Sequence, residues 1–215
     1  MVIGIDGPAG SGKGTVAKII AEKLDIVYID TGAMYRCVAL AALRNNLDLD
    51  DKDQITKLSH QIKIELDSSG HVFLDGEDVS HQIREKDVTG IVSQISSIVE
   101  VREEMVLQQR KLAEGLDVIM EGRDITTVVF PDADYQFYLD ASISERARRR
   151  YLQNKENGID MSYDEIIQNI EKRDYNDMHK KVGSLKKTEQ QIYIDTTDMT
   201  IDEVVTFIMN KIGEK

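Results

Sequence analysis

Residues 4–15 read GIDGPAGSGKGT and overlap the end of a short apolar run, VIGI (2–5). The run predicts a strand, and the segment KGTVAKIIAEKL (13–24) predicts a helix because its apolar residues recur at helical spacing. A glycine-rich loop between a strand and a helix lets backbone N–H groups and the helix N-terminus surround a phosphate. The spacing from Gly7 to Lys13 fits the P-loop pattern, so the sequence indicates a nucleotide-binding protein.

The loop itself supplies most of the expected donor site. Its expected ATP-binding residues are Gly7, Pro8, Ala9, Gly10, Ser11, Gly12, Lys13, Gly14 and Thr15. Lys13 is expected to be catalytic because its charge can follow the β- and γ-phosphates during transfer. Gly14 stands where the usual pattern has a hydroxyl ligand of Mg²⁺, and the hydroxyl moves to Thr15. The form GKGT is similar to that of nucleoside monophosphate kinases, which implies that Mg²⁺ is held mainly by phosphates and water, with Thr15 as the candidate protein ligand.

The rest of the chain alternates short apolar runs with longer helical segments. Further strands are predicted at 26–29, 117–120, 134–139 and 191–195, and a helix at 31–46. Continuous apolar strands separated by helices predict an α/β fold with a buried, parallel, five-stranded sheet and helices on both faces. The segment 62–79 instead alternates apolar and polar residues around the turn signals SSG and DG, which predicts a small antiparallel insert.

Composition limits the classes of function. The chain has 215 residues, 41% hydrophobic residues and a formal net charge of −12, so one domain with a packed core is expected. An acidic surface repels DNA, RNA and anionic membranes, which disfavours nucleic-acid and membrane partners. Cys37 is the single cysteine, lies in an apolar helical pattern, and is expected to be inert packing. We find no signal peptide and no membrane-spanning run, so a cytoplasmic location is expected.

A phosphoryl acceptor that is itself a phosphate needs a second group of positive charges. One candidate stretch is DTGAMYR (30–36), with Thr31 as the expected helix N-cap and Arg36 in the first turns. The other is EGRDI, whose Arg123 and Asp124 are favoured because ligands bind at the carboxyl ends of parallel strands. Arg36 taken alone fits a solvated helix face equally well.

Four arginines crowd one predicted helix, ERARRR (145–150). In a protein with a net charge of −12 they favour a lid whose arginines close over the donor phosphates. Arg146, Arg149 and Arg150 share one helix face, whereas Arg148 points elsewhere. We expect Arg146 to contact ATP and Arg150 to be catalytic.

Four stretches, taken together, carry a resemblance to a known family. They are GPAGSGKGT, DTGAMYR, EGRDI with VVFPDA, and RDYND with IDTTDMTIDEVV, in this order and spacing. This set resembles the bacterial cytidylate kinases, the (d)CMP kinase family, from Val2 to about Ile212, and an inserted small sheet is a feature of that family. The resemblance implies a single P-loop kinase domain over 1–215. Its parts are a core (1–30, 117–145 and 186–215), a CMP-binding region with the inserted sheet (about 31–116) and a helical lid (about 146–180).

The resemblance also implies an activity and a set of residues. The enzyme is expected to transfer the γ-phosphoryl group of ATP, bound with Mg²⁺, to CMP or dCMP, and to be a monomer. The implied CMP-binding residues are Thr31, Arg36, Ser93, Arg102, Arg123, Asp124, Arg173, Asp177 and Lys180. Arg36, Arg123 and Lys180 are assigned to the phosphate, Ser93, Arg102 and Asp124 to cytosine, and Arg173 and Asp177 to the ribose; Arg123 is also expected to be catalytic. Without the resemblance, Ser93 and Arg102 are interpreted as helix-surface residues.

Several positions depart from the family pattern. Lys180 stands where arginine is usual and lacks the bidentate fork of arginine. His179 replaces a common asparagine and is interpreted as a surface residue. Gly183-Ser184-Leu185 replaces the usual Ser-Pro-Leu, which is expected to loosen that loop, and Thr126 replaces a glycine.

Two other readings remain open. One is a kinase of the same fold that acts on UMP, AMP or a non-nucleotide acceptor. The other is a P-loop protein that uses nucleotide as a switch and has no acceptor. A guanine-specific NKxD motif is absent at 154–157, where the sequence reads NKEN inside an expected helix. The second group of arginines argues against a switch, because a switch needs only one anion site.

Overall fold

The computed structural model describes residues 1–67, 70–156 and 158–213 and is built around one parallel sheet. The strand order is β2-β6-β1-β7-β8, and every neighbouring pair runs parallel. The strands are β1 (Val2–Asp6), β2 (Val27–Asp30), β6 (Val118–Gly122), β7 (Tyr135–Asp140) and β8 (Ile192–Asp195). The predicted five-stranded parallel sheet is therefore confirmed, with strand ends shifted by one or two residues.

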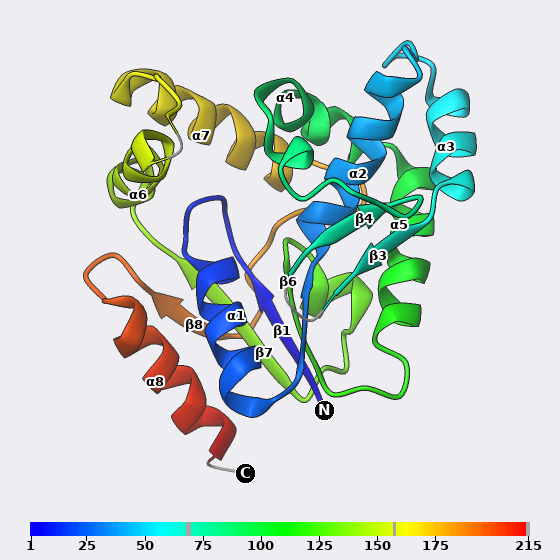
Figure 1. Cartoon of the computed structure of the whole chain (residues 1–215). Coiled ribbons are helices and arrows are strands. Elements are labelled where there is room, and N and C mark those ends of the chain that lie inside the picture. Colours follow the sequence, from blue (N-terminus) through cyan, green and yellow to red (C-terminus); the bar gives the residue numbers. More distant parts are fainter. Residues whose placement is uncertain (68–69, 157, 214–215) are drawn as a thin grey trace.

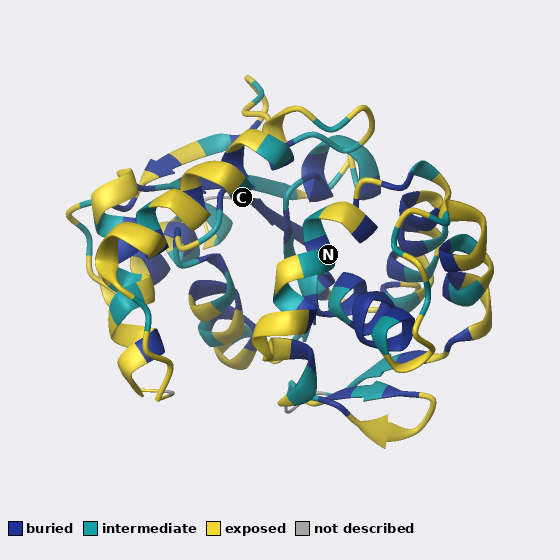
Figure 2. Ribbon diagram, turned by 90° about the horizontal axis from the view of Figure 1, so that it is seen from above, coloured by how far each residue is buried: buried dark blue, intermediate teal, exposed yellow. Residues whose placement is uncertain are grey.

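Helices cover both faces of the sheet (Figure 1). Helices α1 (Lys13–Leu24) and α8 (Ile201–Gly213) pack with β1, β7 and β8 around a core that includes Phe137. On the other face, α5 (Val99–Leu112) and the short π-helical segment η2 (Ile125–Val129) pack against β6. Buried residues line the inner ribbons and exposed residues the outer helix faces (Figure 2). This arrangement is the one that continuous apolar strands require.

The segment that separates β2 from β6 along the chain forms a second hydrophobic core. It is built from α2 (Thr31–Arg44), α3 (Lys52–Gln61), η1 (Gln82–Arg84), α4 (Lys86–Ile95) and part of α5, together with a small sheet. That sheet contains β3 (Ile64–Leu66), β4 (Val72–Leu74) and β5 (Glu77–Asp78), paired antiparallel in this order. The predicted antiparallel insert is confirmed. Asp75 and Gly76 turn between β4 and β5 with positive φ, as the DG signal predicts, whereas both serines of SSG lie outside the described residues.

The helices α6 (Ile143–Glu156) and α7 (Tyr163–Met178) form a pair with a small core of their own around Ala147, Ile166 and Ile170. Helix α7 begins with a capping box in which Ser162 and Glu165 satisfy each other's backbone N–H groups. Figure 1 shows the pair above the loop between β1 and α1, across from α2 and α4. Residues 154–156 of NKEN lie in α6, as expected, and Asn157 lies outside the described residues.

The N-cap of α2 differs from the prediction. The N-cap is Asp30, whose Oδ1 accepts the N–H of Ala33 at 2.9 Å, so Thr31 is the first helical residue and not the cap. The Thr31 hydroxyl instead donates to the carbonyl of Glu121 at 2.8 Å and ties α2 to β6. Strand β2 continues into Asp30 and the chain turns at once, so the helix starts at residue 31 as predicted but its N-cap lies one residue earlier.

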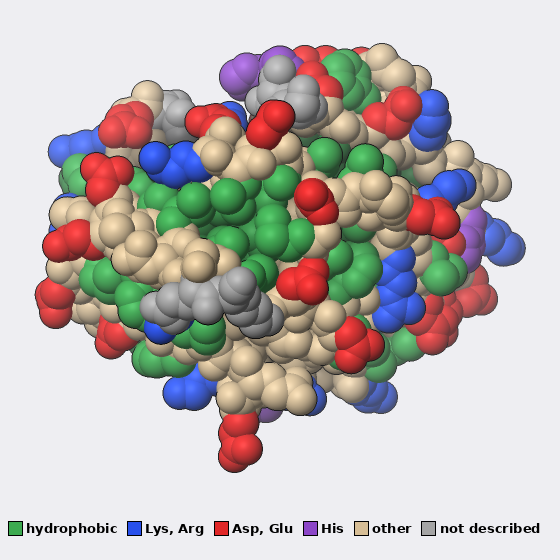
Figure 3. All heavy atoms as spheres, turned by 90° about the horizontal axis from the view of Figure 1, so that it is seen from below, with side chains coloured by type: hydrophobic (Ala, Val, Ile, Leu, Met, Phe, Trp, Pro, Cys, Tyr) green, Lys and Arg blue, Asp and Glu red, His purple; other side chains and the backbone are tan. Residues whose placement is uncertain are grey.

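Cys37 is fully buried in α2, and burial raises the pKa of its thiol to about 12, in line with its expected role as inert packing. On the face seen in Figure 3, acidic side chains are scattered around a central group of hydrophobic ones. None of the helices in the described ranges is both long enough and apolar enough to span a membrane.

Candidate active site

The loop from Gly7 to Gly12 connects β1 to α1 at the carboxyl edge of the sheet. Gly7 has φ +149°, and a Cβ there would lie 2.0 Å from the carbonyl oxygen of Leu139, so only glycine fits. Lys13 is buried, and its ammonium donates to the carbonyl of Pro8 at 2.8 Å. Burial, followed by the charge of Arg123, lowers the pKa of Lys13 to about 7. The loop therefore holds a buried amine that an incoming phosphate can charge.

Gly14 leaves room for a carboxylate beside the loop. A Cβ at this position would lie 3.3 Å from Oε1 of Glu121 and 3.3 Å from the hydroxyl of Tyr28. Glu121 belongs to β6, and burial, followed by the charge of Asp30, raises the pKa of its carboxyl group. Thr15 is exposed in the first turn of α1. Glycine at position 14, in place of the usual hydroxyl-bearing residue, therefore leaves space for the Glu121 carboxylate of β6.

Four of the expected CMP-binding residues form one cluster around the carboxylate of Asp177 in α7. Arg123 Nε and Lys180 Nζ each lie 2.8 Å from this carboxylate, and Arg173 Nε lies at 4.0 Å. Burial opposes ionisation of Asp177, yet these three cations lower its pKa. Burial, followed by Arg123, lowers the pKa of Arg173 to about 10. Three cations against one carboxylate leave an excess of positive charge that suits an anion.

Arg36 stands at the same edge of the sheet. Its Nη2 lies 2.8 Å from Oδ2 of Asp30, and both side chains are mostly buried. Burial opposes ionisation of Asp30, but Arg36 lowers its pKa. Asp30 of β2 is aligned with Glu121 of β6 in the parallel pairing. Arg36 is therefore bound to Asp30 at the end of β2. The alternative interpretation of Arg36 as a solvated residue on a helix face is wrong.

Arg102 and Asp124 make a buried ion pair between α5 and the segment after β6. Arg102 is 3% exposed, donates to the carbonyl of Ser96 at 3.1 Å, and lies over the ring of Tyr35. The interpretation of Arg102 as a helix-surface residue is therefore wrong. Ser93, half-buried in α4, accepts hydrogen bonds at its carbonyl from the hydroxyls of Ser96 and Ser97.

The segment that follows α7 lies over this ion pair. Lys180 Nζ donates to the hydroxyl of Ser96 at 2.9 Å as well as to Asp177. Gly183 has φ +64°, and a Cβ there would lie 2.1 Å from Nη2 of Arg102 and 2.3 Å from Oδ2 of Asp124. Leu185 is buried. Gly183 therefore lies tightly against the pair, where the departure from the family pattern predicted a looser loop. His179 is exposed and stacks on Tyr175, in agreement with its interpretation as a surface residue.

The arginines of α6 diverge. Arg146 is buried, and its Nη1 lies 2.7 Å from Oδ2 of Asp174 and 3.1 Å from the carbonyl of Ala9 in the P-loop. Arg149 donates to the hydroxyl and the carbonyl of Thr196, after β8. Arg148 pairs with Glu145 of its own helix, and Arg150 with Gln153. Arg146 thus donates a hydrogen bond to the P-loop, and a Cβ at Gly12 would lie 3.7 Å from Nη1 of Arg149.

Sequence reasoning missed several acids at this edge. Asp6, Asp30 and Glu121 are the last or next-to-last residues of three parallel strands. Asp174 in α7 is the partner of Arg146. The available signal was their position at predicted strand ends, where side chains converge on a ligand site.

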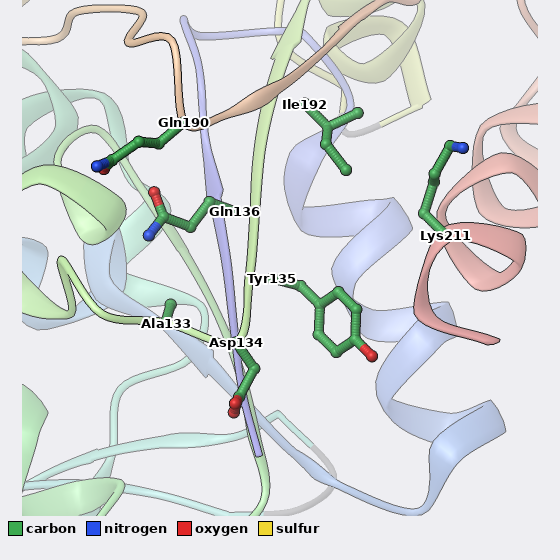
Figure 4. A pocket seen from close by; sticks show the side chains of 7 residues that line it. All are labelled: Ala133, Asp134, Tyr135, Gln136, Gln190, Ile192 and Lys211. Atoms are coloured by element: carbon green, nitrogen blue, oxygen red, sulfur yellow. The ribbon is translucent and has the colours of Figure 1, made fainter. Parts of the chain in front are cut away.

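A pocket elsewhere on the surface is not part of this site. It is lined by Ala133, Asp134, Tyr135, Gln136, Gln190, Ile192 and Lys211 (Figure 4). These residues lie at the starts of β7 and β8 and on α8, which is the opposite end of the strands from the P-loop.

The chain matches known proteins along nearly all of its length. A family model described as Cytidylate kinase matches residues 3–214. A cytidylate kinase from Caldanaerobacter subterraneus is 52% identical over 94% of this chain and 90% of its own length. A cytidylate kinase from Streptococcus uberis is 50% identical over 97% of this chain and 94% of its own length.

One solved structure supports the fold. An uncharacterized protein from Eubacterium ventriosum has a TM-score of 0.55 at 13% identity, and the match covers 100% of this chain and 99% of that protein. At this identity the likeness concerns the fold alone. The family match over residues 3–214 and the identities of about one half, together with the P-loop and the arginine cluster, show that the chain belongs to the cytidylate kinase family.

Proposed function

We propose that this kinase transfers the γ-phosphoryl group of ATP to CMP or dCMP, giving ADP and CDP or dCDP. The observation that carries the proposal is the group of three cations, Arg123, Arg173 and Lys180, around Asp177. This group lies near the P-loop, because the charges of Arg123 and Arg173 lower the pKa of Lys13. A phosphate donor and a phosphate acceptor need two neighbouring anion sites. A nucleotide switch needs one, so this cluster favours transfer.

The donor occupies the P-loop in this proposal. Backbone N–H groups from Gly7 to Thr15 surround the ATP phosphates, and Lys13 turns from the Pro8 carbonyl to the β- and γ-phosphates. Arg146 already contacts the P-loop, which supports its assignment to ATP. Arg150 has only a neutral partner, Gln153, among its described hydrogen bonds, so it is available to a phosphate when the lid closes.

The residues beside the P-loop are also suited to bind Mg²⁺. Oxygen atoms are the ligands that Mg²⁺ prefers, and Thr15 and Glu121 supply a hydroxyl and a carboxylate beside the loop. Bound with ATP, Mg²⁺ would be held mainly by phosphates and water and would neutralise charge on the transferred group. The chain's own task is then to position the two nucleotides and to exclude water.

The acceptor lies against the second group of residues. Its phosphate is assigned to Arg36, Arg123 and Lys180, and its ribose to Arg173 and Asp177. Thr31 joins α2 to β6 and so holds the start of this region in place.

Cytosine is assigned to Asp124, Arg102 and Ser93. A carboxylate at Asp124 accepts from the exocyclic amine of cytosine, whereas uracil presents an oxygen there. A desolvated polar site rejects such a mismatch strongly. The buried ion pair of Asp124 with Arg102 supports this assignment, because Arg102 holds the Asp124 side chain at the end of β6, beside the expected acceptor site.

The transfer itself needs no covalent intermediate and no general base. The acceptor phosphate is already an anion, so an in-line attack on the γ-phosphorus requires alignment and neutralisation of charge. Lys13, Arg123 and Arg150 are assigned to that neutralisation. Closure of α6 and α7 over the site would exclude water, which otherwise would hydrolyse ATP.

The same proposal covers the organisation of the chain. We infer a single kinase domain with a core, a CMP-binding region over about 31–116 and a lid over about 146–180. The separate hydrophobic cores of these regions support a relative motion between them. A monomeric, cytoplasmic enzyme without nucleic-acid or membrane partners remains the expectation from the resemblance and from the net charge of −12.

A coupled assay of ADP release tests the proposal. Purified enzyme is supplied with Mg·ATP and, in separate reactions, with CMP, dCMP, UMP, AMP, GMP or no acceptor. Release that depends on CMP or dCMP is the expected result. Release without an acceptor would favour a nucleotide switch, and a preference for UMP or AMP would overturn the assignment of Asp124 and Arg102.

Binding of ATP at pH 8 is expected to take up about one proton per site. In the free enzyme the pKa of Lys13 is lowered to about 7, so its amine is mostly neutral at pH 8. Phosphates beside Lys13 raise that pKa and charge the amine, and the proton comes from the buffer. Calorimetric titrations in two buffers of different ionisation enthalpy measure this uptake. Lys13→Met is expected to abolish it, and equal enthalpies in both buffers for the wild type would contradict the prediction.

A further inference from the structure

Asp6 makes contacts that the proposed mechanism does not use. It is the last residue of β1 and is fully buried. Its Oδ1 accepts the N–H of Ile125 at 2.7 Å, and its Oδ2 accepts the N–H of Thr126 at 2.9 Å. These two N–H groups are the first two of η2, so a side chain 119 positions away in the sequence caps this segment.

The residue in the local N-cap position is Asp124, and its side chain does not cap η2. An aspartate at that position ordinarily accepts an N–H two or three residues further on. Buried N–H groups need an acceptor, so without Asp6 the carboxylate of the N-cap residue, Asp124, is the one expected to supply it. Here the Asp124 carboxylate is turned toward Arg102.

Further buried hydrogen bonds surround the Asp6 carboxylate. The hydroxyl of Thr126 donates to Oδ2 of Asp6 at 2.7 Å, and Nε2 of Gln191 donates to the Thr126 hydroxyl at 2.6 Å. Gln191 Oε1 accepts the N–H of Thr188 at 2.7 Å, which fixes its amide. Gly4 makes room for this arrangement, since a Cβ there would lie 2.5 Å from the Thr126 methyl. The two η2 N–H groups, one on each carboxylate oxygen, therefore set the orientation of Asp6, and the Thr126 hydroxyl is an additional donor.

We propose that Asp6 is a positioning residue for acceptor specificity. By capping η2 in place of Asp124, it leaves the Asp124 carboxylate free to recognise the base of the acceptor nucleotide. The inference rests on the proposed function, because it assumes that the base meets Asp124. It assigns the aspartate that immediately precedes the P-loop glycine to recognition of the acceptor, not to binding of the donor.

The test is the ratio of kcat/KM for CMP to that for UMP in Asp6→Asn. The asparagine oxygen can accept one N–H of η2, but its amide group opposes the other, so Asp124 turns back to cap. The ratio is expected to fall about tenfold or more, with the KM for ATP within about twofold of the wild type. Asp6→Ser, which removes the carboxylate without adding volume, is expected to act in the same direction.

Thr126→Val is the matched control. This variant removes the buried Thr126 hydroxyl at nearly constant side-chain volume. The N–H groups of Ile125 and Thr126 still bind the Asp6 carboxylate. Its CMP to UMP ratio is expected to stay within about threefold of the wild type. A ratio unchanged in both Asp6 variants, or lowered equally by Thr126→Val, would overturn the proposal.

A double variant separates positioning from general damage to the site. If Asp6 acts through Asp124, then Asp6→Asn combined with Asp124→Asn has the same CMP to UMP ratio as Asp124→Asn alone. Losses that multiply would mean that Asp6 acts by another route. A wild type without any preference for CMP would defeat the proposed function, whereas an intact preference that Asp6→Asn leaves unchanged defeats only this inference.

A crystal structure of the wild type with CMP bound tests the proposal without a variant. Asp6 should accept both η2 N–H groups while the Asp124 carboxylate contacts the base. Asp124 accepting from the N–H of Thr126 or Thr127 instead would overturn the proposal, even if every Asp6 variant failed to fold.

Discussion

Replacing Arg123 by alanine is expected to lower kcat about a thousandfold, while the affinity for ATP stays within about threefold. Arg123 follows β6 directly, pairs with Asp177 and lies near Lys13. It is therefore the cation best placed to neutralise charge on a group that passes from donor to acceptor. The ATP phosphates keep the backbone N–H groups of the P-loop and Lys13 in the variant, so donor binding survives.

Two further variants serve as a charge-conserving comparison and as a control. Arg123→Lys keeps the charge without the planar fork and is expected to recover part of kcat. Arg148→Ala is the control, because Arg148 is exposed and its ion pair is with Glu145 of its own helix, α6. Turnover measured at saturating CMP, beside ATP titrations by calorimetry, gives both quantities. Equal losses of turnover and ATP affinity in Arg123→Ala would show that Arg123 belongs to the donor site.

The second large effect is expected for Asp124→Asn. The variant is nearly isosteric, but its amide group faces the exocyclic amine of cytosine and offers a donor to uracil. The kcat/KM for CMP is expected to fall by about a hundredfold or more, and that for UMP to fall less or to rise. The buried Arg102 also loses its counter-charge, so thermal stability is expected to fall.

The ratio of CMP to UMP activity separates these two effects, because it does not depend on the folded fraction of the enzyme. Asp132→Asn, at an exposed carboxylate before β7, is the control for loss of a negative charge. A variant that loses stability while the CMP to UMP ratio stays at the wild-type value would mean that the Arg102–Asp124 pair is structural and does not contact the base.

Local patterns predicted the sheet and the P-loop because these depend on short stretches of sequence. VIGI and the helix that begins at Lys13 carry their own periodicity, and the glycines and Lys13 of the loop match the P-loop spacing. The DG turn of the insert needs only two residues with positive φ. Such features are decided within a few positions of the chain.

The acceptor region was predicted less completely because its key contacts join distant segments. Arg102 lies in a helix that reads VEVREEM, where an arginine looks solvated, and it is buried by contacts with other elements, among them Asp124 and Tyr35. Asp6 gains its role from two N–H groups more than a hundred residues away. The Asp30 cap of α2 was missed because Asp30 and Thr31 are both good capping residues and only the end of β2 chooses between them.

The identity of the labelled product tests the central claim most directly. The enzyme is incubated with Mg²⁺, ATP labelled in its γ-phosphate, and CMP, and the products are separated by chromatography. Direct transfer between two adjacent anion sites predicts that the label appears in CDP at the same rate as ADP is formed. Label recovered as inorganic phosphate in the presence of CMP would contradict the account, because the cation cluster around Asp177 would then not hold an acceptor.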